Sequence, residues 1–89
     1  MKAIVSIIGM DKPGIVATVA NVLAENKVNI TDISQAYAGE FFTMITVVDF
    51  DKTEATLKEV GEKLKEACDK IGIFVSIQHE DVFRAMHRI

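Results

Sequence analysis

The order of apolar patterns along the chain predicts a two-layer α/β sandwich, with two helices packed on one face of a four-stranded antiparallel sheet. Four short runs rich in β-branched and aromatic residues alternate with two segments of helical periodicity, in the order strand, helix, strand, strand, helix, strand. No composition break interrupts the 89 residues, a length typical of one domain. We therefore expect a single domain over residues 1–89, with a core in residues 1–79 and a helical tail in residues 80–89.

The first half of the chain predicts a strand, a helix and a β-hairpin. The first strand covers Lys2–Ile8, and the helix covers Pro13–Glu25 because its apolar residues recur at the three-and-four spacing of one helix face. The second strand runs from Val28 to Tyr37 and the third from Phe41 to Phe50. Gly39 lies between them and is free to adopt the positive φ of a tight turn.

The second half predicts a helix, a strand and a short terminal helix. Asp51 is expected to be the N-cap of the helix, with Glu54 completing a capping box three residues later. Gly72 ends this amphipathic helix, and the fourth strand covers residues 73–79. The last ten residues, 80–89, can form a helix whose apolar side carries Val82, Phe83, Met86 and Ile89.

Right-handed crossovers over one sheet give the strand order 4-1-3-2, which is a ferredoxin-like α/β (α+β) sandwich. In this order the first and third strands are central, and both are apolar on both sides. Two helices cover only one face, so the second face needs cover from the tail or from a partner chain. We favour a partner and expect a homodimer. The two sides of the third strand carry Phe42, Met44 and Val48 on one face and Phe41, Ile45 and Val47 on the other.

Composition excludes several classes of function. A net charge of −3 and a pI near 5.3 disfavour direct binding of nucleic acid. Cys68 is the only cysteine, so an intramolecular disulfide is impossible, and its place on an apolar helix face predicts a packed thiol. The sequence shows neither a signal peptide nor a membrane-spanning run, and we expect a cytoplasmic protein without a membrane partner.

The most informative motif is the strand-to-helix junction Gly9-Met10-Asp11-Lys12-Pro13-Gly14-Ile15-Val16. The unpaired N–H groups at a helix start suit a carboxylate or a phosphate, so a small-molecule site is expected here first. An α-carboxylate could accept from the N–H groups of Gly14 and Ile15, while Asp11 or Asn29 accepts from the ammonium group. The alternative is purely structural, with Asp11 as a helix cap and Pro13 at an early helix position.

Metal and catalytic chemistry find little support in the residues. His79, Glu80, Asp81 and His87 lie at a polar strand end and on a short helix, which offers too few fixed ligands for a buried metal site. The histidines and Cys68 are on different elements, so no nucleophile and base are paired. We expect no catalytic residue, no metal and no cofactor.

With this junction, the later pair Asn29-Ile30 and the element order, residues 1 to about 79 resemble an ACT domain, the small ligand-binding module of amino-acid metabolism. The ending Val82-Phe83-Arg84-Ala85-Met86-His87-Arg88-Ile89 resembles the uncharacterised family of stand-alone, single-ACT-domain proteins. The resemblance implies side-by-side pairing across an edge strand and an amino acid held near the interface. Carried over by position, the ligand-facing residues are Met10, Asp11, Pro13, Gly14, Ile15 and Val16, with Asn29 and Ile30 contributed across the interface.

The leading hypothesis is therefore a non-enzymatic, cytoplasmic regulatory module that binds an amino acid or a similar small metabolite. ACT domains are commonly fused to the enzyme or DNA-binding domain that they regulate, and this chain shows neither, which implies a separate partner enzyme or regulator. The alternative is a protein–protein interaction module, or a regulatory subunit without a small-molecule ligand. A small enzyme is the third class and has no supporting residue pattern.

Overall fold

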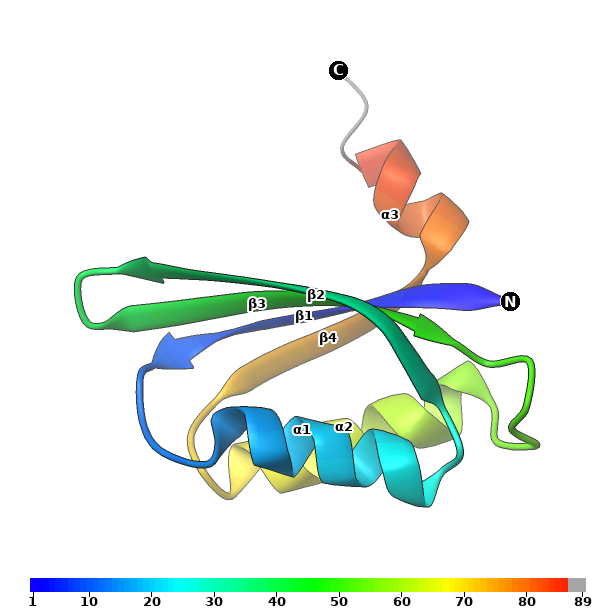
Figure 1. Cartoon of the computed structure of the whole chain (residues 1–89), viewed down its shortest axis with the longest axis horizontal. Coiled ribbons are helices and arrows are strands. Elements are labelled where there is room, and N and C mark those ends of the chain that lie inside the picture. Colours follow the sequence, from blue (N-terminus) through cyan, green and yellow to red (C-terminus); the bar gives the residue numbers. More distant parts are fainter. Residues whose placement is uncertain (87–89) are drawn as a thin grey trace.

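Two helices cover one face of a four-stranded antiparallel sheet, and a short third helix stands on the opposite face (Figure 1). The structure is a computed structural model that describes residues 1–86. The predicted βαββαβ order with a terminal helix is confirmed. The elements are β1 (Lys2–Met10), α1 (Ile15–Glu25), β2 (Asn29–Ala38), β3 (Phe41–Asp49), α2 (Leu57–Asp69), β4 (Phe74–His79) and α3 (Glu80–Met86).

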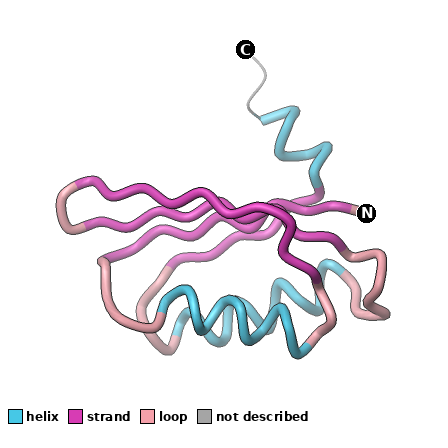
Figure 2. The backbone as a smooth tube through the Cα atoms, viewed as in Figure 1, coloured by secondary structure: helices cyan, strands magenta, loops and turns pink. Residues whose placement is uncertain are grey.

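The sheet has the order β2-β3-β1-β4, which confirms the predicted order 4-1-3-2. Figure 2 shows the four strands as one layer above the two long helices. All neighbouring strands are antiparallel. Met10 of β1 lies opposite Phe41 at one end of the sheet, and Lys2 lies opposite Asp49 at the other end. β2 and β4 are therefore the two edge strands, and each leaves one row of backbone groups without a sheet partner.

The core lies between the sheet and the two long helices. β3 alternates regularly, with Phe42, Met44 and Val48 buried against the helices and Phe41 and Ile45 exposed on the other side. Both faces of the central strands are apolar, as the sequence predicted. We call the side that α1 and α2 cover the helix face and the other side the outer face. α1 and α2 contribute Ile15, Val19, Leu23, Val60, Leu64 and Cys68 to the core.

Cys68 is fully buried, which confirms the prediction of a packed thiol. Burial raises the pKa of this thiol above its ordinary value, and the nearby Asp69 raises it further. Because the thiolate is the reactive form, a raised pKa and a buried position both keep this side chain unreactive in the folded protein.

The predicted start of the second long helix was wrong. Asp51 is not a cap, because it pairs with the amino group of Met1, and this hydrogen bond holds the pKa of Asp51 below its ordinary value. The N-cap is Thr56, whose hydroxyl accepts from the Glu59 N–H while the Glu59 carboxylate accepts from the Thr56 N–H, both at 3.1 Å. This capping box replaces the predicted box of Asp51 and Glu54.

The other element ends also differ from the prediction. β1 continues two residues beyond Ile8, because Gly9 and Met10 still pair with β3. α1 begins at Ile15 and not at Pro13. The terminal helix α3 is described as far as Met86, so the predicted residues His87 and Ile89 lie outside the described part. No helix within residues 1–86 combines the length and the apolar character needed to cross a membrane.

Candidate functional site

The turn between β1 and α1 presents an uncapped helix start. Gly14 is the N-cap residue and has φ 89° and ψ 0°, a left-handed conformation that favours glycine. The first backbone hydrogen bond of the helix runs from the Thr18 N–H to the Gly14 carbonyl oxygen at 2.9 Å. No side chain caps this end. The structural alternative in which Asp11 caps the helix is therefore wrong, and the N–H groups of the first turn point out without an intrahelical acceptor.

Two hydrogen bonds hold the turn against distant parts of the chain. The Asp11 N–H donates to the carbonyl oxygen of Glu40 in the β2–β3 hairpin at 2.9 Å. The Lys12 ammonium donates to the carbonyl oxygen of Ile71, just after α2. A basic group at this position also complements the negative C-terminal end of α2. These two hydrogen bonds therefore hold the turn against the β2–β3 hairpin on one side and against the turn after α2 on the other.

A hollow of about 240 Å³ lies beside this helix start. It collects four of the predicted ligand-facing residues, Asp11, Gly14, Ile15 and Val16, and Met10 and Pro13 lie outside its lining. By register, Met10 pairs with Phe41 on the outer face of the sheet. Sequence reasoning missed the other residues of the lining, which are Lys12, Ala17, Gln35, Tyr37 and Phe42.

The hollow combines an apolar floor with charges of both signs. Ile15 and Phe42 are buried, and the Tyr37 ring stands over Phe42 with 5.3 Å between the ring centroids. Asp11 supplies a carboxylate and Lys12 an ammonium group, while Gln35 adds an amide that can donate and accept. The volume lies just below the range of about 300–1,000 Å³ that holds drug-sized ligands, and it suits a small metabolite.

Asn29 and Ile30 do not reach this hollow within one chain. They begin β2, opposite Asp49 and Val48, whereas the hollow touches the last part of the same strand. At about 3.3 Å per residue, the eight positions between Asn29 and Tyr37 span roughly 26 Å. Within one chain, these two predicted ligand-facing residues therefore lie outside the hollow.

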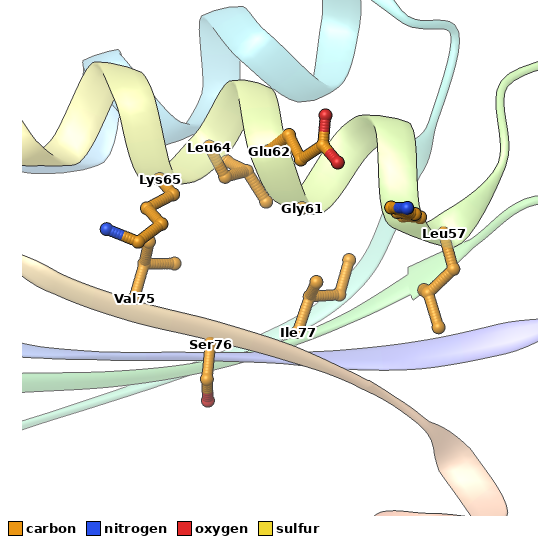
Figure 3. A pocket seen from close by; sticks show the side chains of 9 residues that line it. Leu57, Gly61, Glu62, Leu64, Lys65, Val75, Ser76 and Ile77 are labelled. Atoms are coloured by element: carbon orange, nitrogen blue, oxygen red, sulfur yellow. The ribbon is translucent and has the colours of Figure 1, made fainter.

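A larger groove, about 580 Å³, lies between α2 and the edge strand β4 (Figure 3). Val75 and Ile77 point from β4 toward α2, and Ser76 points to the opposite side of the sheet. Gly61 permits the close approach of the two elements, because a Cβ there would lie 2.8 Å from Cγ2 of Ile77. The walls are mainly aliphatic, and the charged residues Lys58, Glu62 and Lys65 of α2 also line the groove. This groove lacks the uncapped helix start of the first hollow.

His79, the histidine within the described residues, forms a hydrogen bond at the start of α3. Nδ1 of His79 accepts a hydrogen bond from the Asp81 N–H at 3.0 Å, at the start of α3. Within residues 1–86, no group of three or more histidine, cysteine, aspartate or glutamate side chains is arranged to hold a metal ion. His87 lies outside the described residues.

Comparison with known proteins shows the family to which this chain belongs. The model of the ACT domain family matches residues 2–78, which include the complete junction and the hollow. The chain belongs to the ACT-domain family. Its relatives include a UPF0237 protein from Methanopyrus kandleri, which is 44% identical over 88 residues and aligns over 99% of this chain and 98% of the relative. The resemblance to small proteins with a single ACT domain is thereby confirmed.

Solved structures give the same result. The ACT domain protein from Streptococcus pneumoniae superposes with a TM-score of 0.82 and 37% identity, covering 98% of both chains. The regulatory subunit of aspartate kinase from Thermus thermophilus is also similar, with a TM-score of 0.66 and 30% identity over 86% of this chain and 50% of that subunit. The ACT domain described here is thus similar both to a protein of its own length and to part of a regulatory subunit.

Proposed function

We propose that this ACT domain is a non-enzymatic regulatory module that binds an amino acid in the hollow beside Gly14. The observation that carries the proposal is the pairing of an uncapped helix start with charges of both signs in one small hollow. The N–H groups of the first turn and Lys12 suit an α-carboxylate, and Asp11 suits an α-ammonium group. A zwitterion matches this arrangement better than a simple anion, because a simple anion leaves Asp11 as a repulsive neighbour.

The site is proposed to be completed in a homodimer that pairs through β2. Every residue from Thr31 to Ala38 is exposed, although the strand is ten residues long and is hydrogen-bonded on one side only. Ile33 and Tyr37 present apolar surface on its helix face. A long exposed edge of this kind is a template for pairing with a second copy.

Antiparallel pairing of two β2 strands explains how Asn29 and Ile30 could serve the site. A two-fold axis midway along β2 places the start of one strand beside the end of the other. Asn29 and Ile30 of the partner subunit would then lie next to Tyr37, which lines the hollow. A ligand held by both chains would therefore stabilise the dimer. The dimer is proposed to act in the cytoplasm on a separate partner enzyme or regulator.

Isothermal titration calorimetry of the twenty amino acids tests the proposal. We expect one of them, or a small group of similar structure, to bind the unaltered protein with one site per chain. Asp11→Ala removes the carboxylate, and Gly14→Leu places a side chain at the hollow, where an added Cβ meets no atom within 4 Å. Each variant is expected to abolish the binding heat. Asp11→Ala should leave the fold intact because Asp11 caps nothing, and Gly14→Leu should strain only the turn before α1, because Gly14 has φ 89° and open space around it.

Two matched variants control for side effects. Gly39→Leu imposes the same kind of strain, since Gly39 has φ 62° and open space around it, but it does not line the hollow. Glu54→Ala removes an exposed carboxylate from the loop after β3, at the other end of the sheet from the junction. Both should bind as the unaltered protein does. Equal binding by Asp11→Ala and Gly14→Leu would place the ligand elsewhere. If no amino acid binds at all, the alternative of an interaction module without a small-molecule ligand takes precedence.

A further inference from the structure

The outer face of the sheet carries a second unexplained surface, away from the ligand hollow. Five of its large apolar side chains are 43–65% exposed. They form one contiguous apolar patch, and exposed patches of this kind are often interaction sites. They are neighbours by register, because Met10 pairs with Phe41 and Ile8 pairs with Phe74. We call this surface the outer patch, and it consists of Ile8, Met10, Phe41, Ile45 and Phe74.

Within residues 1–86, the four strands place no ionisable side chain on the half of the outer face that holds this patch. Alternation along the four strands places only serine, threonine and alanine between its apolar residues. The charged residues of the same face, Lys2, Asp32 and Asp49, are all at the other end of the sheet. The uncharged residues of the patch half, besides the five apolar ones, are Ser6, Ser34, Ala36, Ala38, Thr43 and Ser76.

The rest of the outer face is partly covered by α3. This helix packs on β1 and β4, and Phe83 lies at the border of a groove of about 290 Å³ whose floor includes Ser6 and Ser76. Figure 1 shows α3 standing over one end of the sheet, on the side away from α1 and α2. The face thus combines a raised part, the helix, with a hollow part, the groove. A surface with both parts can be complementary to itself around a two-fold axis.

We propose that the outer patch binds the outer patch of a second copy of this chain, face to face, with each α3 lying against the open half of the other sheet. The lack of charge in the patch half is the first argument, because two such halves of a chain with net charge −3 meet without like-charge repulsion. The charged residues of α3 are Glu80, Asp81 and Arg84, and Glu80 and Arg84 form an ion pair within the helix. A charged ligand or partner would find no group to pair with in the patch half. This contact uses the flat face of the sheet and is separate from edge pairing through β2.

The available area is the second argument. Side chains of this size present roughly 200 Å² when fully accessible, so the five residues expose about 100 Å² each. The patch alone therefore offers about 500 Å² per chain, and a stable interface buries about 800 Å² per partner. Val82 on α3, which is itself exposed, and the polar residues between the apolar ones supply the remainder. The face is thus large enough for a dimer without any contribution from the ligand hollow.

The test is the protection of a thiol placed in the middle of the face. Ser76→Cys introduces a thiol that lines the open groove, and the buried Cys68 gives no background reaction. We expect alkylation by iodoacetamide to slow by about tenfold as the protein concentration rises from micromolar to millimolar, because self-association then covers the face. The control Glu62→Cys, on the exposed side of α2, should show no dependence on concentration.

Two isoleucines of similar exposure separate this interface from edge pairing. Ile45 lies in the outer patch and is 43% exposed, and Ile33 lies on the helix face of β2 and is 40% exposed. Ile45→Lys should abolish the protection of the introduced thiol, and Ile33→Lys should leave it unchanged. Phe74→Lys, at the most exposed position, repeats the test with the least risk to folding.

Three results would overturn the proposal: no protection at any concentration, protection that survives Ile45→Lys and Phe74→Lys, or protection that appears only when lipid vesicles are added. The last result would assign the face to a membrane surface. The assay contains no amino acid, so its outcome is independent of ligand binding.

Discussion

The hydroxyl of Thr46 is expected to weaken this domain. Thr46 is fully buried on the helix face of β3, opposite Val5 of β1 and Ile33 of β2. Its Oγ1 has no hydrogen-bond partner among the described residues. Burying a hydroxyl without a partner costs about 1–3 kcal/mol in proteins. Thr46→Val replaces the hydroxyl by a methyl group of similar shape, so the cost is removed and the packing is kept.

We expect Thr46→Val to raise the free energy of unfolding by about 1–2 kcal/mol, at the lower part of that range because the added methyl group must still fit a dense core. For a domain of this size, each kcal/mol shifts the melting temperature by about 4–8 °C. Urea unfolding measures the change, at one fixed protein concentration because self-association would add to stability. The slope of the transition should not change.

Thr43→Val is the matched control. Thr43 lies three residues earlier on β3, on the outer face, and is half-buried. Its hydroxyl donates a weak hydrogen bond to the Ala36 carbonyl oxygen at 3.4 Å. We expect this variant to stay within about 0.5 kcal/mol of the unaltered protein. The reasoning fails if Thr46→Val is neutral or destabilising, or if Thr43→Val gives the same gain.

Two further predictions concern the N-terminus of α2 and the packing of α3 on the sheet. Hydrogen bonds from Thr56 hold the pKa of Glu59 below its ordinary value of 4.5, so the carboxylate contributes stability above that pH and loses it as the pH falls through the folded-state pKa. The stability advantage of the unaltered protein over Glu59→Gln, from urea unfolding, should therefore shrink between about pH 5 and pH 3, and a constant difference would contradict this assignment. Phe83→Ala should cost about 1–2 kcal/mol of unfolding free energy, because the half-buried ring anchors α3 on the sheet. An unchanged stability would show that α3 adds nothing to the fold.

The sequence was sufficient for the fold because its two periodicities are strong. Alternation in residues 41–50 separated the buried Phe42 and Met44 from the exposed Phe41 and Ile45, and right-handed crossovers then left one strand order. The residues at which helices begin were harder to predict from the sequence. Asp51 with Glu54 and Thr56 with Glu59 have the same capping pattern, and the structure forms the reciprocal hydrogen bonds at Thr56 and Glu59, while Asp51 pairs with the Met1 amino group.

The candidate site was predicted only in part, because its second half comes from a different element. The motif from Gly9 to Val16 identified the helix start, but Gln35 and Tyr37 lie on β2 and carry no local signal. The register of the β2–β3 hairpin would have placed both residues on the helix face. A hairpin centred on Gly39 places Tyr37 opposite Phe42, and Phe42 was already assigned to one face of the sheet. The partner of Tyr37 and the hollow above it follow from that pairing.

The hydrogen bonds of the junction connect the hollow to the turns beside both edge strands. Asp11 is hydrogen-bonded to Glu40 in the hairpin that ends β2, and Lys12 is hydrogen-bonded to Ile71 just before β4. A ligand carboxylate that attracts Lys12 competes with the Ile71 carbonyl oxygen for the same ammonium group. In the proposed complex, binding would therefore act both on the turn before β4 and on the hairpin after β2. Edge strands are where a sheet meets other chains, so under the proposed function ligand binding would change how this domain assembles.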